Sequence, residues 1–359
     1  MENKYLAYLH YIWFTSKNLE KVFCNSTDYK NFFENFGYSD LIKAWIREEK
    51  ANTILENKAK FRAEIIDKLI KDFWVELISV KDPDYPEELK KLTIPPFLLY
   101  VRWNLRKNSN LISIVGSRKA TKYSEIILDN IIPGLIKNDF WVVSGWAYWV
   151  DSLAHKITLK HWWYTISVVG TGIDIYYPFT NKALYEEIIK TGGAVVSIFP
   201  FKTIWTPYNF PIRNEIIACL SRWTLITEAW DKSWTLITAR LALELNKDVF
   251  VIPGDITREA SIWSNKLIQN WLGKPTMSYE DIIEEYWDTI KLEEKIKNIE
   301  FGDELEEKIY NSVLKEVSSA ETIAEALDID ISIASYKLSI LEINWLISAE
   351  IWGNYRVVI

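Results

Sequence analysis

The sequence predicts an α/β protein built on a doubly wound, mainly parallel sheet, with a small helical domain before it and a winged-helix domain after it. Three observations support this. From residue 111 onward, short apolar runs rich in β-branched residues alternate with helical runs, which is typical of βα units. Before residue 65, apolar residues recur every three to four positions. After residue 304, three helical runs precede two short extended runs, the pattern of a winged helix.

The domains follow from these patterns in order. Residues 1–65 are expected to form the helical domain, and residues 66–110, with Asp-Pro, Tyr-Pro and Pro-Pro steps, a connector packed on the next domain. Residues 111–290 are expected to form a Rossmann-like domain that binds its ligand at the carboxyl ends of the strands. Residues 304–359 form the winged helix. The six strands of the Rossmann-like domain are predicted at 111–115, 141–144, 165–169, 194–198, 224–228 and 248–253.

The composition excludes several classes of protein. With 49% hydrophobic and 25% charged residues, the 359-residue chain is that of an ordinary globular protein. Two cysteines, Cys24 and Cys219, and three histidines argue against a disulfide framework and against a Cys/His metal cluster, so neither a metal nor a cofactor is expected. The sequence shows neither a signal peptide nor a long apolar run, which predicts a cytoplasmic protein without a membrane span.

A phosphate site is predicted where the first strand of the sheet domain ends. The segment "IVGSRKAT" places Gly116, Ser117, Arg118 and Thr121 between a strand and a helix that begins near Tyr123. Free N–H groups at a helix N-terminus, together with hydroxyl and guanidinium donors, favour an anion. The alternative is that Arg118 only caps a neighbouring element.

Six segments of the sheet domain occur together in one order: "IVGSRKAT", "VSGWAYWVDSLAH", "VVGTGIDIYYP", "YNFPIRNEIIACLS", "EAWDKSWTLITARLALE" and "IPGDITREASIWSNKLIQNW". In this order and at this spacing they resemble the family of DNA-processing protein A, also called Smf. The resemblance implies a single-stranded DNA-binding protein, typically a homodimer, that protects the strand and loads the RecA recombinase on it during natural transformation or recombination.

The resemblance and the residue chemistry together give a contact set for single-stranded DNA. Ser117 and Arg118 would hold a phosphate, Arg213 and Asn214 the next part of the strand, and Phe210 would offer a stacking surface or else be an ordinary core aromatic. The expected set is Gly116, Ser117, Arg118, Thr121, Ser144, Gly145, Phe210, Arg213, Asn214, Ser233 and Thr235. The family commonly has a second basic residue after Asn214, whereas this chain has Glu215, which removes a positive charge near the expected path of the strand.

Two other classes of function are open to a chain of this kind. Related nucleotide hydrolases carry PGGxGTxxE, but Thr238 stands where that glutamate would be. Asp151 and His155 lie four residues apart on a helix, which favours a structural contact over a catalytic pair. Asp174 is interpreted as a residue that shapes a loop. No catalytic residue is therefore expected.

The remaining class is a transcription regulator that acts through the winged helix. Such a domain should be basic. Residues 291–359 instead carry 7 Lys/Arg against 14 Asp/Glu, with Lys337 as the only cation of the expected recognition helix. Self-association or contact with a protein partner is therefore expected of this domain.

Tryptophan is unusually frequent and glycine unusually rare. The chain has 18 Trp and 12 Gly, and a usual Gly share would be about 7%. The resembling family requires Gly at Trp149, Trp234 and Trp263. It favours Gly at Trp13, Trp74, Trp103, Trp141, Trp146, Trp162, Trp163, Trp271 and Trp345. We therefore expect a gene in which UGA encodes glycine, read here as tryptophan; genuine Trp substitution is the alternative.

Overall fold

The computed structural model describes residues 2–24, 27–108, 110–117, 121–146, 149–230, 234–287, 301–315, 318–344, 346–350 and 353–357. The chain forms two compact units, Met1–Ile283 and Glu284–Ile359, and each is described by itself. Over the described residues, no helix combines the length and the apolar character that crossing a membrane requires.

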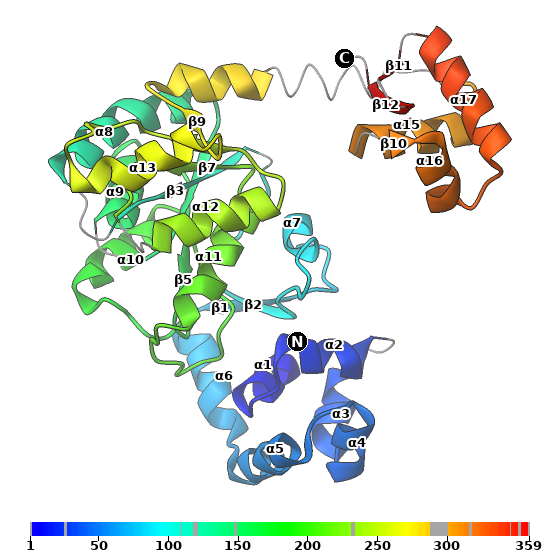
Figure 1. Cartoon of the computed structure of the whole chain (residues 1–359). Coiled ribbons are helices and arrows are strands. Elements are labelled where there is room, and N and C mark those ends of the chain that lie inside the picture. The colour runs from blue at the N-terminus through cyan, green and yellow to red at the C-terminus, as the bar shows by residue number, and fades with distance from the viewer. Residues whose placement is uncertain are drawn as a thin grey trace. The chain divides into compact units, whose positions relative to one another are not determined.

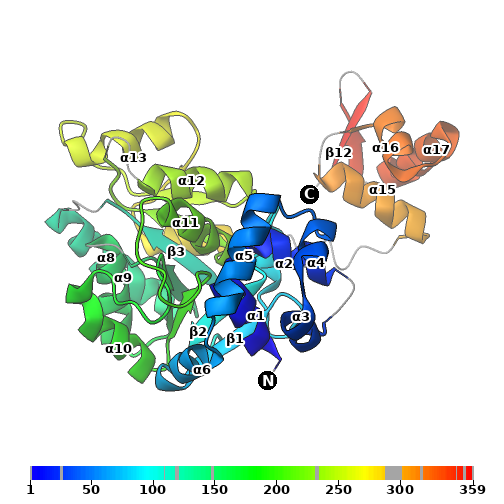
Figure 2. The same ribbon diagram turned by 90° about the horizontal axis from the view of Figure 1, so that it is seen from below.

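Six short helices open the first unit and pack beside the first strands of the sheet (Figure 2). They are α1 (Asn3–Tyr11), α2 (Ser16–Phe23), α3 (Tyr29–Asn35), α4 (Tyr38–Lys43), α5 (Glu48–Lys60) and α6 (Ala63–Asp72). Their apolar faces belong to one buried cluster with side chains of the sheet domain, including Tyr100, Tyr185 and Phe201. Because burial of shared apolar surface stabilises their contact, the helices and the sheet form one body.

A nine-stranded sheet in the order β1-β2-β6-β5-β4-β3-β7-β8-β9 forms the centre of the first unit (Figure 1). The strands are β1 (Val75–Ser79), β2 (Leu98–Arg102), β3 (Leu111–Val115), β4 (Trp141–Ser144), β5 (Thr165–Val169), β6 (Ala194–Ser197), β7 (Trp223–Ile226), β8 (Val249–Val251) and β9 (Lys274–Pro275). All pairs from β6 to β9 are parallel. The prediction of a mainly parallel sheet with six central strands is confirmed.

The expected connector contributes strands of its own to this sheet. Its two extended runs are β1 and β2, which pair antiparallel with each other, and β2 pairs antiparallel with β6. The prolines that suggested a connector lie in the segment between the two strands, where missing N–H groups cost no ladder hydrogen bonds. Within residues 66–110, the first seven complete α6, and β1 and β2 form an integral edge of the sheet.

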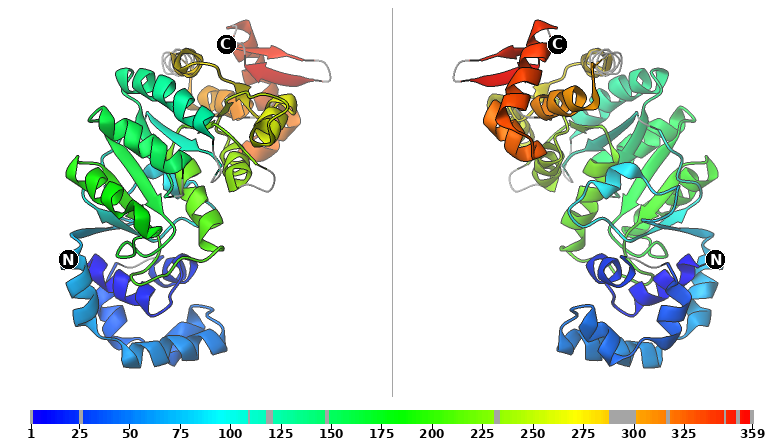
Figure 3. Two further views of the ribbon diagram at one scale, coloured as in Figure 1. Left: turned by 90° about the vertical axis from the view of Figure 1, so that its left-hand side faces the viewer. Right: turned by 90° about the vertical axis from the view of Figure 1, so that its right-hand side faces the viewer.

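Helices cover both faces of the sheet (Figure 3). Three of them pack side by side: α8 (Lys122–Lys137), α9 (Val150–Lys160) and α10 (Lys182–Lys190). Three others follow β6, β7 and β8: α11 (Asn209–Leu220), α12 (Trp234–Glu244) and α13 (Glu259–Gln269). The central strands β3 and β5 are buried along their whole length, which is what a sheet covered on both sides requires.

The second unit is a separate small domain. Its helices are α15 (Glu304–Lys315), α16 (Ala320–Leu327) and α17 (Ile331–Ile343), and its strands β10 (Ser318–Ser319), β11 (Ile347–Ala349) and β12 (Asn354–Val357) form a sheet in the order β10-β12-β11. The helices close over a cluster that includes Ile309, Tyr310 and Leu338. The predicted three helices and antiparallel hairpin are confirmed, and the short strand β10 is an addition.

Left-handed backbone conformations coincide with tryptophans. Of the eleven non-glycine residues with positive φ in the described part of the chain, seven are Trp: Trp13, Trp45, Trp74, Trp103, Trp149, Trp162 and Trp271. Each of these side chains is more than half exposed. Positive φ brings Cβ close to the backbone of every residue except glycine, so the backbone at these positions has the conformation that glycine favours. Trp146, in contrast, is buried in the core against Tyr185.

Candidate nucleic-acid interface

The strand order changes direction beside β3, and the loops after β3 and β7 meet there. β3 lies between β4 and β7, so the strands that follow it in sequence are added first on one side of it and then on the other. Ligands of doubly wound proteins bind in the crevice at such a switch point. The Ser117 amide at the end of β3 donates a hydrogen bond to the Glu228 carbonyl at the end of β7, at 2.9 Å. Gly116 allows this approach, because a Cβ there would lie 2.5 Å from Thr227 Oγ1.

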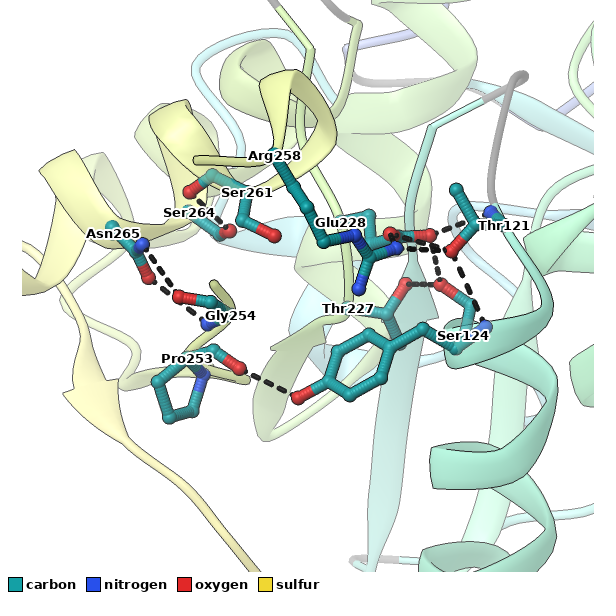
Figure 4. A network of polar contacts seen from close by, with 11 residues as sticks. Thr121, Ser124, Thr227, Glu228, Pro253, Gly254, Arg258, Ser261, Ser264 and Asn265 are labelled. Carbon is teal, nitrogen blue, oxygen red and sulfur yellow. Dashed lines mark hydrogen bonds and ion pairs between the residues drawn. The ribbon is translucent and has the colours of Figure 1, made fainter. Parts of the chain in front are cut away.

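A buried carboxylate organises this edge of the sheet. The Glu228 side chain has no exposed surface. It accepts hydrogen bonds from the Thr121 amide at 2.7 Å, the Thr121 hydroxyl at 2.9 Å and the Ser124 hydroxyl at 2.8 Å, as Figure 4 shows. Thr121 is also the N-cap of α8 and accepts from the Tyr123 amide. Glu228 therefore fixes the start of α8, the helix that follows the predicted phosphate loop.

Arg258 closes the network from the other side. This residue precedes α13, and its guanidinium donates to a Glu228 carboxylate oxygen at 2.8 Å and to the Thr121 hydroxyl (Figure 4). It also lies over the Tyr123 ring, with Cζ 4.9 Å from the centroid. A charge-assisted bond to a buried carboxylate is among the stronger hydrogen bonds in proteins. Arg258 thus balances the charge of Glu228 and brings a partly exposed cation to the loop.

The loop after β4 is built around a second buried ion pair. Gly145 follows β4, and a Cβ at this position would lie 1.9 Å from Arg213 Nη1 and 2.4 Å from Asp151 Oδ2. The two charged groups are 3.9 Å apart, and Arg213 Nη1 also donates to the Val168 carbonyl at 2.9 Å. Beside them, the Ser144 hydroxyl is buried and donates to the Ile114 carbonyl at 2.6 Å. The absence of a side chain at Gly145 therefore leaves the space that the Arg213–Asp151 ion pair occupies.

His155 has a structural place in this loop. Its Nε2 donates to the Gly145 carbonyl at 3.0 Å, and its Nδ1 lies 2.8 Å from the Thr165 hydroxyl. The ring has no exposed surface. Burial lowers the pKa of His155 to about 4, partly offset by the bond to Gly145 and reinforced by the charge of Arg213. The imidazole is accordingly neutral and held on both sides, which agrees with the structural interpretation of the Asp151–His155 spacing.

This shifted pKa makes the stability of the fold depend on pH. An unfolded histidine binds a proton below its ordinary pKa of 6.5, whereas His155 in the folded protein binds it only near 4. The stabilisation is therefore present above pH 6.5 and is lost as the pH falls toward 4. Between pH 7 and pH 5 we expect this group to lower the free energy of unfolding by about 2 kcal/mol. Urea unfolding of the protein and of His155→Gln should show a smaller pH dependence in the variant, and equal dependence would contradict this role.

The expected contacts on α11 lie mostly inside the protein. Phe210, Arg213 and Asn214 are buried, with the Arg213 guanidinium 5.8 Å from the Phe210 ring centroid. Glu215 is two residues from Arg213 and so lies on another face of the helix. Burial, and then the charge of Glu244, raise the pKa of Glu215. Its neighbour is thus the end of α12, away from the Arg213 pair.

Other expected site residues have varied positions. Thr235 and Thr238 are buried in the first turns of α12, and Asp174 accepts hydrogen bonds from the Lys202 amide, in line with its expected role in shaping a loop. Arg118 and Ser233 lie outside the described residues. The exposed Trp149 is the N-cap of α9 at a φ of 73°.

Sequence reasoning missed Glu228 and Arg258. Glu228 is the last residue of the predicted strand 224–228, at the carboxyl end where ligand-side residues occur, and this position was a usable signal. Arg258 occurs in the segment "IPGDITREA", which carried the family resemblance as a whole without any single residue being chosen from it. Its partner is 30 residues away in sequence, so only the folded chain reveals the pair.

A doubly wound sheet with polar loops at its switch point, a helix start and a cation beside them is the arrangement in which α/β proteins commonly bind anions. The family model of DNA recombination-mediator protein A matches residues 76–287, more than half of the chain. The protein therefore belongs to this family, and the resemblance inferred from the six sequence segments is confirmed.

Individual relatives agree with this assignment. Protein Smf from Synechocystis sp. is 40% identical over 183 residues, 50% of this chain and 46% of that protein, so the match spans about half of that relative. DNA processing protein DprA from Streptococcus pneumoniae is 35% identical over 209 residues, 58% of this chain and 73% of that protein.

Two solved structures are similar as well. The crystal structure of DNA processing protein A from S. pneumoniae has a TM-score of 0.66 at 29% identity, covering 79% of this chain and 97% of that one. DNA processing protein A from Helicobacter pylori, whose structure is described for its single-stranded DNA binding mode, has a TM-score of 0.53 at 25% identity, covering 60% and 97%.

Proposed function

We propose that this protein binds single-stranded DNA at the switch-point edge of its sheet and acts as a recombination mediator. The observation that carries the proposal is that both ends of the segment after β3, at Ser117 and Thr121, are bonded to Glu228, with Arg258 beside them. Anchored ends reduce the conformational entropy that is lost when a phosphate binds between them, which favours binding.

The binding mode follows from the accessible groups. Gly116 and Thr121 are partly exposed at the loop, and Arg118 lies between them in sequence. We assign the phosphate contact to this loop and to Arg258. Ser144, Gly145, Arg213 and Asn214 form the buried layer beneath it, where the Arg213–Asp151 pair keeps the loop after β4 in place. Such a site reads phosphates and base faces, so little sequence preference is expected.

The same proposal covers the biological role. As a member of the family of recombination mediators, the protein would act as a homodimer that protects incoming or processed single strands and loads the RecA recombinase on them. The rival function, hydrolysis of a nucleotide, would need a free carboxylate at the site. The carboxylates buried at this edge are both engaged: Glu228 accepts from Thr121, Ser124 and Arg258, and Asp151 faces Arg213, which suits positioning roles.

Replacing Arg118 by Ala should weaken binding of a labelled oligo-dT by about 1–3 kcal/mol, because a charge-assisted phosphate contact is lost. The plot of log affinity against log salt should also become shallower by about 0.7, the value for one phosphate contact on a single strand. Arg240→Ala is the matched control, since Arg240 is an exposed arginine of α12 paired with Glu244. A gel-shift titration in which both variants bind as the unaltered protein does would remove Arg118 from the site.

Removing the second unit should leave the affinity for single strands nearly unchanged. Lys337, on α17, is tied to Asp303 at 2.5 Å and to Glu306 at 2.8 Å, and these bonds raise its pKa. The charge of Lys337 is thus neutralised by carboxylates of its own domain. Residues 291–359 carry a net charge of −7, which repels phosphates. Truncation after about residue 290 should keep or slightly raise the affinity for oligo-dT. A tenfold loss, about 1.4 kcal/mol, in a folded truncated protein of unchanged oligomeric state would assign this domain to DNA.

A further inference from the structure

A groove separates the N-terminal helices from the loops that follow β6. Its volume is about 550 Å³. One wall comes from the end of α1, the end of α5 and the start of α6, with Tyr11, Phe61 and Ile65. The other wall is the segment from Pro200 to Asn209. Because β6 runs parallel to the central strands, this wall lies at the carboxyl edge of the sheet, the edge that carries the candidate site.

Helix α11 begins at the groove and carries residues of the candidate site. Asn209 lines the groove and starts this helix, and its amide donates to the Gly170 carbonyl at the end of β5. The next residue, Phe210, belongs to the expected contact set for single-stranded DNA and packs beside Arg213. A nucleic-acid strand that leaves the candidate site along the start of α11 would therefore reach the groove next.

Both walls of the groove are held in fixed positions. The Thr203 carbonyl accepts from the Gly172 amide at 2.9 Å, which joins the loop after β6 to the loop after β5. Phe201 packs edge-on against Tyr100 of β2 at 5.2 Å, and both belong to the cluster that buries the N-terminal helices. Both walls of the groove therefore belong to one compact unit and are joined by buried contacts.

The groove combines positively charged side chains with aromatic ones. Lys60, Arg62 and Lys202 line it and are exposed, whereas no Asp or Glu does. Within the described ranges, none of the three cations takes part in a salt bridge, and the carboxylate that acts on one of them, Asp174, bonds to the Lys202 amide and does not line the groove. Tyr11 and Phe61, with ring centroids 6.0 Å apart, add aromatic surface. Cations that follow a backbone, with aromatic side chains that receive bases, are what single-stranded nucleic acid binding uses.

We propose that this groove is a second subsite for single-stranded nucleic acid, which takes the part of the strand that extends beyond the switch-point site. The inference rests on the proposed function, because the strand reaches the groove from that site. Lys60, Arg62 and Lys202 contact successive phosphates, and the rings of Tyr11 and Phe61 receive bases. The helical domain thereby lengthens the binding site and favours long strands over short ones.

The test compares two oligonucleotides on one set of proteins. Oligo-dT of about 6 nucleotides fills one subsite, and oligo-dT of about 20 nucleotides spans both. In the triple variant Lys60→Ala/Arg62→Ala/Lys202→Ala, affinity for the long oligonucleotide should fall about tenfold or more, and its salt slope should become shallower by about 2, at 0.7 for each lost phosphate contact. Binding of the short oligonucleotide should stay as it is.

The control carries the same loss of charge elsewhere on the helical domain. Lys17, Lys21 and Lys43 are exposed on α2 and α4 and do not line the groove, so their triple alanine variant should bind both oligonucleotides normally. The groove proposal is overturned if its variant loses affinity for neither oligonucleotide, or for both equally. Failure of the unaltered protein to bind either oligonucleotide would instead remove the proposed function, and the groove with it.

Discussion

Replacing the seven tryptophans of positive φ by glycine should stabilise the protein by several kcal/mol. At Trp13, Trp45, Trp74, Trp103, Trp149, Trp162 and Trp271 the left-handed backbone costs an L-residue about 1–2 kcal/mol. Part of this gain, about 0.5–1 kcal/mol for each position, is offset by the greater freedom of glycine in the unfolded chain. Little burial is lost, because each indole is more than half exposed. Urea unfolding of the sevenfold variant measures the sum.

The matched control is alanine at the same seven positions. Alanine removes the indole but keeps Cβ, so the glycine variant should be the more stable of the two. A further comparison is Trp223, which is 2% exposed and stacks on Phe140 at 5.6 Å. Trp223→Gly should cost about 3–5 kcal/mol, as loss of a buried aromatic does. Equal stability of the glycine and alanine variants would contradict the backbone explanation.

We propose that glycine is the native residue at the positive-φ positions because the gene uses UGA as a glycine codon. Six of the seven are positions where the family resemblance had already favoured glycine, and the backbone adds Trp45 to them. The gene's codons decide the matter directly. UGA at these positions, with UGG at Trp223, is the expected result, whereas UGG throughout would show that the tryptophans are genuine.

Removing the Glu228 carboxylate should have the second large effect. Glu228→Ala leaves the Arg258 guanidinium and the Thr121 and Ser124 hydroxyls without their buried acceptor. Breaking a fully buried ion pair on one side costs about 3–5 kcal/mol. Because Arg258 is partly exposed and solvent screens its charge, we expect a loss toward the lower end of this range in the free energy of unfolding. Affinity for oligo-dT should fall as well, because Glu228 fixes the start of α8 next to the phosphate loop.

A double-mutant cycle separates the two roles of Glu228. Glu228→Gln keeps the shape and an acceptor oxygen, and Arg258→Met removes the charge it faces. The double variant should be more stable than the sum of the single losses predicts, because each single change leaves one charge unpaired. Additive losses would mean that the two side chains do not act as a pair.

The fold was predictable because its periodicities are strong. Each predicted strand from 111–115 to 248–253 lies on a strand of the structure, since apolar runs buried on both faces leave a clear signal. The two strands within residues 66–110 were interpreted as a connector. They pair antiparallel and are separated by a segment rich in proline, so they lack the regular strand–helix alternation that marks the rest of the sheet. Their place in the sheet depends on pairing with β6, which lies about a hundred residues away in sequence.

The site was predictable in its location and less so in its chemistry. The motifs place Ser117, Gly145 and Arg213 at the carboxyl edge, where the structure has them. Their sequence could not show that Arg213 is buried with Asp151 or that Glu228 organises the loop, because both depend on contacts between residues far apart in the chain. Burial of a polar side chain is a tertiary property, and periodicity alone does not reveal it.

Binding of single-stranded DNA in preference to duplex is the most direct test of the proposed function. Fluorescence titration of the full chain with labelled oligo-dT, and with a duplex of the same length, should be done at two salt concentrations. We expect the single strand to bind at least about tenfold more tightly, a difference of about 1.4 kcal/mol, and its affinity to fall steeply as salt releases the phosphate contacts. Duplex binding of equal or greater affinity, or single-strand binding that salt does not weaken, would contradict the assignment of this edge of the sheet to single-stranded DNA.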